Sequence, residues 1–490
     1  MDFQPLDPQS ESPLYRQLYR QIEEQIRSGK LARGSRLPAT RELAGSLGLN
    51  RTTVSAAYEM LESEGLISGQ VGRGSFVTGG PQHGLSGVNW DALLERSETP
   101  APAHAPTGGK EMIRFVVSRP SAALFPLDAF RASCQAVLAR GDLEDILQLG
   151  SPRGFEPLRR YLLEEARRHN LAGPGDDLLI TNGCQQALDL IGRVLLRPGD
   201  AAAVEDPVYT GLKNLLAGMG ARLAGIPVGT EGIDVESLAR AVGRERPRFL
   251  VVTPNFQNPT GTSLPLGSRR MLLEVAHRAG VPVIENDAYG DLRYWGEPLP
   301  SLKQLDPHGG TVLLRSFSKV SFPGLRVGWV VGPRALIERL RDAKEATDLH
   351  TDQLSQAVLL EFAESGRLEA HRACVLEAGG QRLATTLEAC RQYLPPGTVW
   401  TRPEGGMNLW VRLPEPLDAS ELLPRVQEEG VAYLPGRYFE VTRRDARALR
   451  LSFAGLRPEQ IRKGLEILGK IVAKAMKNAS ESAEPAPAMV

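Results

Sequence analysis

The sequence is poor in cysteine, and it lacks long apolar runs. Its four cysteines are scattered and never spaced as C-x-x-C, so neither a disulfide framework nor a zinc site is indicated. No uninterrupted apolar run approaches the length that crosses a membrane. The opening MDFQPLDPQSES is polar and acidic, unlike a signal peptide. These absences predict a soluble, bacterial-type cytoplasmic protein with no membrane partner.

Net charge is also lacking, because 58 Lys and Arg residues balance 58 Asp and Glu residues. The chain as a whole therefore has no electrostatic attraction to nucleic acid or membrane, and any affinity for DNA has to come from a local patch. At 490 residues the chain is too long for a single hydrophobic core. We therefore expect two or more domains.

Residues 1–78 predict three helices followed by a β-hairpin, which together form a winged helix-turn-helix domain. Apolar residues recur at helical spacing in Leu14–Arg27, Thr40–Leu47 and Arg51–Glu64, and glycines separate these segments. Leu66–Gln70 and Ser75–Val77 have the pattern of two short strands around a Gly-rich tip. In such a domain the third helix presents its N-terminal end to the major groove, and we expect the wing to reach the minor groove.

Positive charge in this domain is concentrated around the turn. Residues 27–51 contain six basic side chains and one acid, whereas residues 1–78 contain nine of each sign. Such a patch neutralises DNA phosphates and releases counterions, and an arginine can read guanine through two hydrogen bonds. The candidate DNA contacts are Arg36, Arg41, Arg51, Thr52, Thr53, Arg73 and Gly74. The alternatives are that these arginines only solvate a small surface domain, or that the domain binds protein.

A Pro- and Gly-rich segment, residues 79–111, reads as a flexible linker. Over residues 112–475, short apolar runs alternate with helical stretches, which favours an α/β fold with a mostly parallel, doubly wound sheet. The predicted strands are Leu178–Thr181, Ala201–Glu205, Ala221–Ile226, Phe249–Thr253, Val281–Glu285, Thr311–Arg315 and Val327–Val331. We also expect a small C-terminal lobe beyond about residue 350, ending in a helix Pro458–Lys474, and a disordered tail, residues 476–490.

Lys319 stands directly after one of these strands, between serines and seven residues before Arg326. A partly desolvated lysine forms a Schiff base with an aldehyde, and hydroxyls and a guanidinium hold a phosphate dianion. The segment Ser316–Gly328 therefore suits an aldehyde cofactor that carries a phosphate. An ordinary surface lysine after a core strand is the plain alternative.

Two further polar segments follow predicted strands in the same way, namely Asn258-Pro259-Thr260-Gly261 and Asn286-Asp287-Ala288-Tyr289. With these residues the chain resembles the fold-type I aminotransferases that bind pyridoxal phosphate (PLP). The stretch LPATRELA at Leu37–Ala44 and the RTTV at Arg51–Val54 resemble the GntR pattern closely. Over roughly residues 12–78 and 112–472 the chain is similar to MocR-type members of the GntR family of bacterial transcription regulators.

The resemblance implies a role for each residue around the ring of the cofactor. Lys319 carries PLP as a Schiff base, and Asp287 pairs with the protonated pyridine nitrogen, which keeps the ring an electron sink. Asn258 and Tyr289 hydrogen-bond the phenolic oxygen. Tyr209 matches the aromatic residue that stacks on the ring.

The resemblance also implies how the charged groups of cofactor and ligand are held. The phosphate cup consists of Gly183, Cys184, Gln185, Ser316, Ser318 and Arg326. Arg450 matches the arginine that holds the α-carboxylate of an amino-acid ligand. Taken singly, each of these residues has a plain explanation as a cap, a turn, core or an ion pair; together and in order they favour the site. Leu149 is a departure, because the family has a tyrosine there that reaches the phosphate of the neighbouring subunit.

The favoured hypothesis is a PLP-responsive regulator of promoter DNA. PLP, or an amino acid or amine bound as external aldimine, would reposition the DNA-binding domains, and the resemblance implies a homodimer. The alternative is a catalytically active PLP-dependent aminotransferase that carries a DNA-binding head. A structural DNA-binding protein with an inactive domain is disfavoured by the intact Lys319, Asp287 and Asn258. The effector stays open among PLP itself, a neutral amino acid, GABA and taurine, as does the choice between activation and repression.

Overall fold

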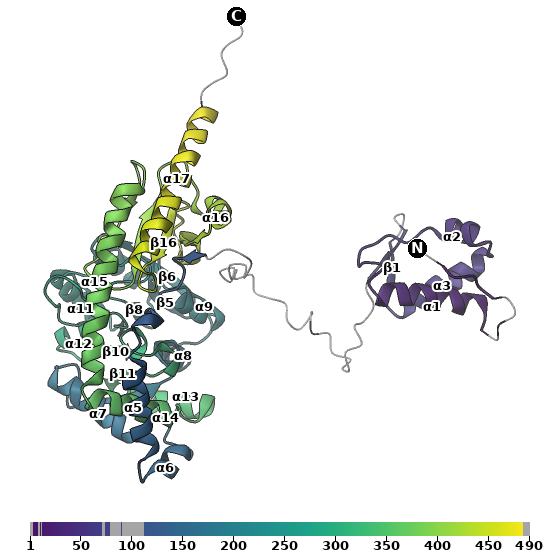
Figure 1. The fold of residues 1–490 in the computed structure, drawn as a ribbon. Coiled ribbons are helices and arrows are strands. Elements are labelled where there is room, and N and C mark those ends of the chain that lie inside the picture. The colour runs from purple at the N-terminus through teal and green to yellow at the C-terminus, as the bar shows by residue number, and fades with distance from the viewer. Residues whose placement is uncertain are drawn as a thin grey trace, which may run out of the picture. The chain divides into compact units, whose positions relative to one another are not determined.

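The computed structural model describes residues 3–7, 10, 12–70, 74–78, 90 and 112–483. The chain divides into two compact units, Met1–Glu98 and Thr99–Val490, both drawn in Figure 1. The predicted linker, apart from Trp90, lies outside the described residues. Within the described part of the chain, no helix combines the length and apolarity that a membrane span requires.

The first unit has the predicted three helices and hairpin. It contains α1 (Leu14–Arg27), α2 (Thr40–Leu47), α3 (Arg51–Ser63) and the antiparallel strands β1 (Ile67–Gln70) and β2 (Gly74–Val77). The predicted bounds of α1 and α2 are confirmed, and α3 ends at the residue before the predicted end.

One apolar core holds this unit together, because the apolar positions of each helix recur on a single face. Leu18 and Ile22 of α1 and Leu61 of α3 are fully buried in it. The side chain of Asn50 accepts a hydrogen bond from the backbone N of Thr52 at 3.2 Å and so caps α3. The start of α3 is therefore held by this cap as well as by the packing of the helix on the core.

The second unit is built on a sheet of eight strands in the order β4-β11-β10-β9-β8-β5-β6-β7. The strands are β4 (Asp176–Thr181), β5 (Ala201–Asp206), β6 (Arg222–Gly229), β7 (Gly232–Ile233), β8 (Leu250–Val252), β9 (Val283–Asn286), β10 (Thr311–Ser316) and β11 (Gly328–Pro333). Neighbours from β6 to β10 are parallel, whereas β11 is antiparallel to β10 and β4, and β7 to β6. The prediction of a mostly parallel sheet is confirmed.

Side chains alternate between the two faces of this sheet, as the strand period of two requires. Leu179, Ile284 and Leu314 pack against α8, α9 and α13 on one face. Ile180 and Leu313 point to the other face, which α5, α7 and α14 cover, with α10 and α11 farther along the sheet. The helices of the large sheet domain, on both faces together, are α5 (Leu127–Leu138), α6 (Leu143–Leu147), α7 (Glu156–Arg168), α8 (Cys184–Leu195), α9 (Thr210–Gly218), α10 (Val235–Glu245), α11 (Leu266–Arg278), α12 (Leu302–Leu305), α13 (Arg334–Asp348) and α14 (Gln353–Glu364).

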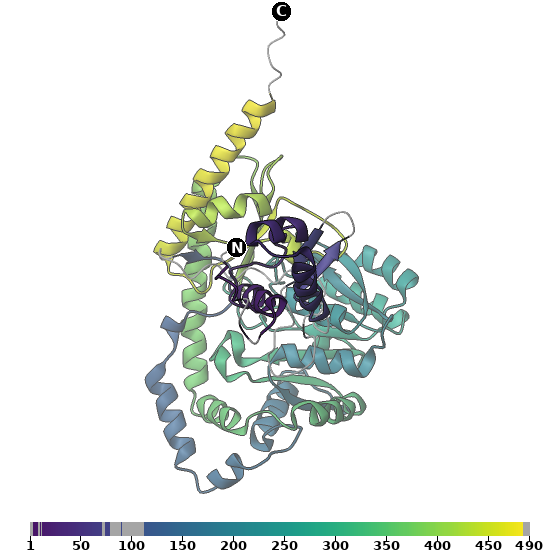
Figure 2. The ribbon, with the colours of Figure 1, turned by 90° about the vertical axis from the view of Figure 1, so that its right-hand side faces the viewer.

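The small lobe contains a four-stranded antiparallel sheet in the order β12-β13-β16-β15. Its elements are β12 (Val399–Trp400), β13 (Asn408–Arg412), β15 (Leu434–Pro435), β16 (Ala448–Ser452), α15 (Arg367–Tyr393), α16 (Ala419–Glu428) and α17 (Pro458–Ala483). A separate pair, β3 (Ile113–Arg114) and β14 (Val431–Ala432), is parallel and ties the start of this unit to the lobe. Helix α17 packs along α15 in both views (Figures 1 and 2).

Two predictions about the C-terminal part are wrong. The lobe expected beyond about residue 350 begins later, because α14 packs on the large sheet and Gly366 separates it from α15. The final helix continues past Lys474 to Ala483, so residues 476–483 are helical rather than part of a disordered tail. Composition alone could not place that end, because polar residues are compatible with an exposed helix as well as with a coil.

Candidate functional site

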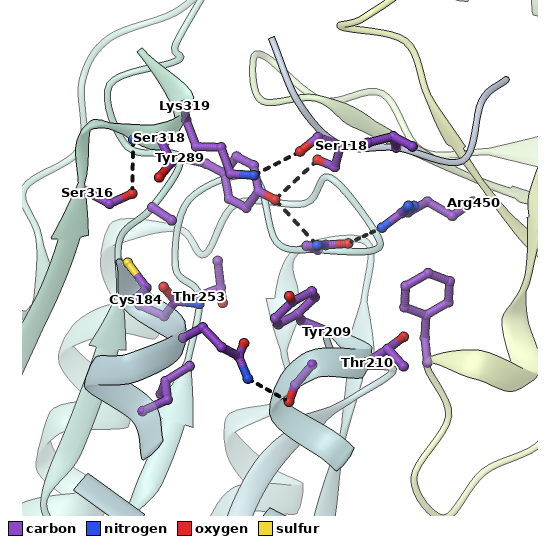
Figure 3. A pocket seen from close by; sticks show the side chains of 18 of the residues that line it. Ser118, Cys184, Tyr209, Thr210, Thr253, Tyr289, Ser316, Ser318, Lys319 and Arg450 are labelled. Carbon is purple, nitrogen blue, oxygen red and sulfur yellow. Dashed lines mark hydrogen bonds between the residues drawn. The ribbon is translucent and has the colours of Figure 1, made fainter. Parts of the chain in front are cut away.

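Five connections meet along one edge of the eight-stranded sheet, because each follows the carboxyl end of a strand. They carry Cys184 after β4, Tyr209 after β5, Asn258 after β8, Tyr289 after β9 and Lys319 after β10. All five residues line one cavity of about 500 Å³ (Figure 3). The structure thus brings the predicted motifs together at the edge where a doubly wound sheet binds its ligand.

The opposite wall of the cavity comes from distant parts of the chain. Ser118, which precedes α5, and Arg450 from the small lobe complete it (Figure 3), together with Phe439 of the same lobe. The guanidinium of Arg450 lies 4.9 Å from the centre of the Phe439 ring. Sequence reasoning missed Ser118 and Phe439, because neither stands in a motif or follows a strand of the large sheet.

Lys319 lies at the end of a short 3-10 turn, Phe317–Lys319, in the connection between β10 and β11. Its Nζ donates a hydrogen bond to the backbone O of Ser118 at 2.8 Å and lies 5.1 Å from the centre of the Tyr289 ring. Among the described residues, no carboxylate pairs with this amine. The amine therefore points into the cavity and is held by one neutral acceptor.

A chain of hydrogen bonds crosses the cavity from Ser118 to Arg450. The Tyr289 hydroxyl lies 3.2 Å from Ser118 Oγ and accepts a bond from Asn258 Nδ2 at 3.4 Å. Asn258 Oδ1 in turn accepts from Arg450 Nη1 at 3.0 Å. Burial would raise the pKa of Tyr289, but the charge of Lys319, the bond with Ser118 and the charge of Arg450 outweigh it and lower that pKa. The phenol is therefore a strong donor toward an oxygen in the cavity.

Arg450 is 4% exposed and has no carboxylate partner among the described residues. Burial lowers the pKa of its guanidinium to about 10, so the group stays positive at neutral pH. Its Nε has no hydrogen-bond partner in the part of the chain that the structure describes. A buried charge without a partner is costly, so this position favours an anionic ligand such as a carboxylate.

Gly183, Ser316, Ser318 and Arg326 form a polar cup at the start of α8. Arg326 Nη2 donates to the backbone O of Asn182 at 3.0 Å, and its Nη1 to Ser318 Oγ at 3.3 Å. Gly183 has a φ of 83°, and a Cβ there would lie 2.5 Å from Arg326 Nη2. Backbone amides at a helix start, hydroxyls and a guanidinium together suit a phosphate dianion.

The remaining predicted residues of the cup and ring also line the cavity. Burial raises the pKa of Cys184 to about 11, so its thiol is neutral at the start of α8. Gln185 Nε2 donates to the backbone O of Gly211 at 3.2 Å, and its Oε1 has no partner among the described residues. Tyr209, at the start of α9, is 38% exposed, which leaves its ring open to stack on a flat ligand.

Asp287, which the resemblance pairs with the ring nitrogen of the cofactor, is not among the residues that line the cavity. Its carboxylate accepts bonds from Arg315 Nη2 at 2.7 Å and Nε at 3.0 Å, and from Asn255 Nδ2 at 2.8 Å. Its neighbour Asn286 lines the cavity instead. Strand alternation is the reason, because Asn286 continues the face of Ile284, which packs toward α8, while Asp287 turns to the other side.

Leu149 follows α6, is 72% exposed, and is not among the residues that line the cavity. The segment before it is held to α14, because Gln353 Nε2 donates to the backbone O of Gln148 at 2.9 Å. Leu149 therefore does not contribute to the cavity of its own chain.

In the first unit, the predicted DNA contacts of α2 and α3 lie on the surface. Arg41, Arg51 and Thr52 are exposed, and Thr53 is half-buried. Within the described residues of this unit, neither Arg41 nor Arg51 pairs with a carboxylate. Their charges are therefore available to a polyanion.

Two more predicted contacts lie beside the hairpin. Arg36 is exposed, and its backbone forms a β-bridge with Phe76 of β2. Gly74 has a φ of 100°, and a Cβ at this position would lie 3.2 Å from Arg36 Nε. Gly74 therefore lets Arg36 lie against the wing. The prediction for Arg73 falls outside the described residues.

Comparisons with known proteins match both units. Residues 125–468 match the family "Aminotransferase class I and II", and residues 14–77 match "Bacterial regulatory proteins, gntR family". Aromatic-amino-acid aminotransferase 1 of Thermococcus litoralis is 34% identical, over 75% of this chain and 89% of its own. The probable rhizopine catabolism regulatory protein MocR of Rhizobium meliloti is 29% identical over 94% of each chain. The structure of LysN, the alpha-aminoadipate aminotransferase of Thermus thermophilus, complexed with N-(5'-phosphopyridoxyl)-L-leucine, has a TM-score of 0.71 at 36% identity and covers 75% of this chain and 94% of that one.

The large unit is thus a fold-type I aminotransferase domain, and its cofactor is PLP. The chain belongs to the class I and II aminotransferase family, and its gntR-type first unit gives it the organisation of the MocR-type transcriptional regulators. The described residues fit PLP. The cavity offers a lysine without an acidic partner, a polar cup at the start of α8, and buried polar atoms of Gln185, Asn286 and Arg450 that have no partner among the described residues.

Proposed function

We propose that this chain is a DNA-binding transcription regulator whose large unit holds PLP on Lys319 and senses PLP itself, an amino acid or an amine. One combination carries the proposal. A cavity with Lys319 and Arg450 occurs in the same chain as an exposed Arg51 at the start of α3, and neither arginine pairs with a carboxylate among the described residues. A metabolic enzyme has no need of the second feature, and a structural DNA-binding protein has no need of the first.

Five residues besides Lys319 would hold the cofactor. Ser316, Ser318 and Arg326 would bind its phosphate together with the start of α8, and Asn258 and Tyr289 would bind its phenolic oxygen. Bound there, PLP supplies an aldehyde that captures a primary amine and a ring that draws electrons from it. The lowered pKa of Tyr289 strengthens the bond that its hydroxyl donates to that oxygen.

The effector that this cavity suits carries a primary amine and an acidic group. Arg450 is already oriented, because Asn258 Oδ1 and the backbone O of Val116 accept bonds from its Nη1 and Nη2. An acid that reaches Arg450 gains a charge-assisted hydrogen bond from a group whose position is fixed before binding. Neutral amino acids, GABA and taurine all meet this requirement, and an amine without an acid meets it only in part.

Regulation requires that the effector bind two arrangements of the protein with different affinity. We propose a homodimer, in which two winged helix-turn-helix domains read two half-sites of a promoter. Arg36, Arg41, Arg51, Thr52 and Thr53 are the contacts proposed from the described residues. Of these, Arg51 is proposed to read a base, and the other arginines to neutralise phosphates.

A working aminotransferase with a DNA-binding head is the second candidate. It is favoured by the degree of identity, 34% with the aromatic-amino-acid aminotransferase against 29% with MocR. The match to MocR, however, covers 94% of this chain and includes the head, whereas the match to the enzyme covers 75%. Coverage of the whole chain therefore favours the regulator.

The test uses the purified full-length chain. After loading with PLP, borohydride reduction and peptide mapping are expected to place the label on Lys319, and Lys319→Ala is expected to abolish the absorbance of bound cofactor. Gel shift on the upstream DNA of its gene, with and without PLP and then with candidate amino acids, reports the response. A label elsewhere refutes the site. Sustained turnover with a keto acid, and no effect of any ligand on the DNA shift, would identify the enzyme instead.

A further inference from the structure

The cavity contains charged and titratable groups, but none of those that line it is a carboxylate. Among the described residues, these lining groups are Cys184, Tyr209, Tyr289, Lys319, Arg326 and Arg450. Asp287, the acid directly after β9, is 4% exposed. Both of its carboxylate oxygens accept hydrogen bonds, one from Asn255 and the other from Arg315. The negative charge of Asp287 is therefore balanced by Arg315, and neither residue lines the cavity.

Asn286 occupies the place at the end of β9 that faces the cavity. It lines the cavity, and among the described residues its Nδ2 donates no hydrogen bond and its buried Oδ1 accepts none. The backbone fixes this orientation, because Asn286 pairs in register with Leu314 of β10, whose side chain also lies on the α8 face. The carboxamide is therefore free to form hydrogen bonds with a ligand in the cavity.

The chemistry of PLP indicates which of its atoms this carboxamide meets. The ring nitrogen lies across the ring from the aldehyde carbon, so with the aldehyde at Lys319 the nitrogen is directed away from that lysine. The phosphate cup at the start of α8 and the phenol partners Asn258 and Tyr289 account for the other polar atoms of the cofactor. Of the lining amides whose oxygen has no partner among the described residues, Gln185 lies at the phosphate end on α8 and Asn214 on α9. Asn286 ends β9, whose connection also carries Tyr289, so it is the candidate partner of the nitrogen.

We propose that Asn286, and not a carboxylate, contacts the ring nitrogen of PLP, and that this nitrogen stays unprotonated when the cofactor is bound. The inference rests on the proposed function, because it assumes PLP on Lys319. A carboxylate favours the protonated nitrogen through its charge, whereas a neutral carboxamide donates a hydrogen bond to the unprotonated one. The cations Lys319, Arg326 and Arg450 around the cavity act in the same direction.

An unprotonated ring withdraws electrons less strongly, so it stabilises negative charge on a captured amino acid less well. The cavity would then bind an amino acid covalently but process it slowly. Persistence of the bound effector is what a sensor needs and what a turnover enzyme avoids. Asn286 would thus let the large unit recognise an amino acid without converting it rapidly, as the proposed regulator requires.

The test is the ¹⁵N NMR spectrum of the full-length protein loaded with PLP that carries ¹⁵N in its ring. The expected result is a resonance of unprotonated pyridine type at neutral pH, and a large shift to the protonated type in Asn286→Asp. Asn214→Asp is the matched control, because Asn214 also lines the cavity with a buried, unpartnered Oδ1 among the described residues. Its resonance is expected to stay at the wild-type position.

The outcomes separate the two proposals. A bound but protonated nitrogen in the wild type overturns the inference about Asn286 and leaves the regulator proposal standing. An equal shift in Asn214→Asp and Asn286→Asp also overturns it, because the effect would then follow charge in the cavity and not contact. Failure to label Lys319 at all refutes both proposals. As a second readout, Asn286→Asp is expected to speed conversion of a bound amino acid in a single turnover.

Discussion

Replacing Arg450 by glutamine removes the cationic group that faces the amino acid and leaves most of the cavity wall in place. Arg450 lies on β16, paired with Trp410 on one side and Leu434 on the other, so its backbone is fixed by the sheet. A glutamine retains an amide that can donate to Asn258, as Arg450 Nη1 does at 3.0 Å. The variant therefore tests the charge rather than the fold.

The size of the effect follows from burial. Arg450 is 4% exposed, so a carboxylate that reaches it exchanges water for a desolvated, charge-assisted bond. Truncating one partner of such a pair costs about 2–5 kcal/mol, or roughly 30- to 4,000-fold in Kd. In the absence of a ligand the guanidinium has no acidic partner among the described residues, so Arg450→Gln is expected to leave the melting temperature unchanged or raised.

The assay is a spectral titration of the PLP-loaded protein with an amino acid and, in parallel, with an amine of the same length that lacks the acid. Affinity for the amino acid is expected to fall in Arg450→Gln, while affinity for the amine stays within a few-fold. Arg437→Gln, at an exposed position nearby in sequence, is the matched control and should change neither. Equal losses for amino acid and amine, or no loss for either, would refute the role of Arg450.

Three further predictions concern the phosphate cup, the DNA-binding head and pH. Gly183→Ala is expected to weaken PLP binding, because its Cβ would meet Arg326 Nη2 at 2.5 Å; titration of apo-protein measures this, and Gly199→Ala, with a φ of 89° and nothing within 4 Å, controls for backbone strain. Arg51→Ala is expected to weaken binding to promoter DNA by about 1–3 kcal/mol and to relax the sequence preference at one base pair, with the PLP spectrum unchanged; an unchanged sequence preference in gel shifts would contradict the assignment. Burial raises the pKa of Glu205 to about 8, above its unfolded value of 4.5. Its contribution to stability is therefore present below pH 4.5 and is lost as pH rises to about 8, so calorimetry should show Glu205→Gln to be less pH-dependent over that window.

Much of the site was predictable because its residues sit in motifs that follow strands. Parallel strands end at a common edge, so Asn258, Tyr289 and Lys319 had to lie close together once the strands were recognised. The positive φ at Gly183 and the start of α8 were likewise local features of one short segment. Local sequence is sufficient where the backbone itself positions the group.

Asp287 lies outside the lining of the cavity for a physical reason that a linear reading does not contain. A carboxylate is the expected partner of a protonated ring nitrogen, and chemistry alone chose it over the neighbouring Asn286. Which of the two faces the cavity depends on the pairing of β9 with β10 and on the side of the sheet that α8 covers. A shift of one residue along a strand reverses the face, so chemistry without register does not decide between the two neighbours.

By itself the sequence determined the winged helix-turn-helix head, the order of strands and helices in the large unit, and the lysine on which PLP is proposed to sit. Those features follow from the spacing of apolar residues and from turns that involve neighbours along the chain. Only the tertiary structure decided that Ser118 accepts a bond from Lys319, that Arg450 faces Asn258, and that an amide rather than an acid ends β9 inside the cavity. These contacts join residues far apart in the sequence, and their geometry exists only when both lobes have packed.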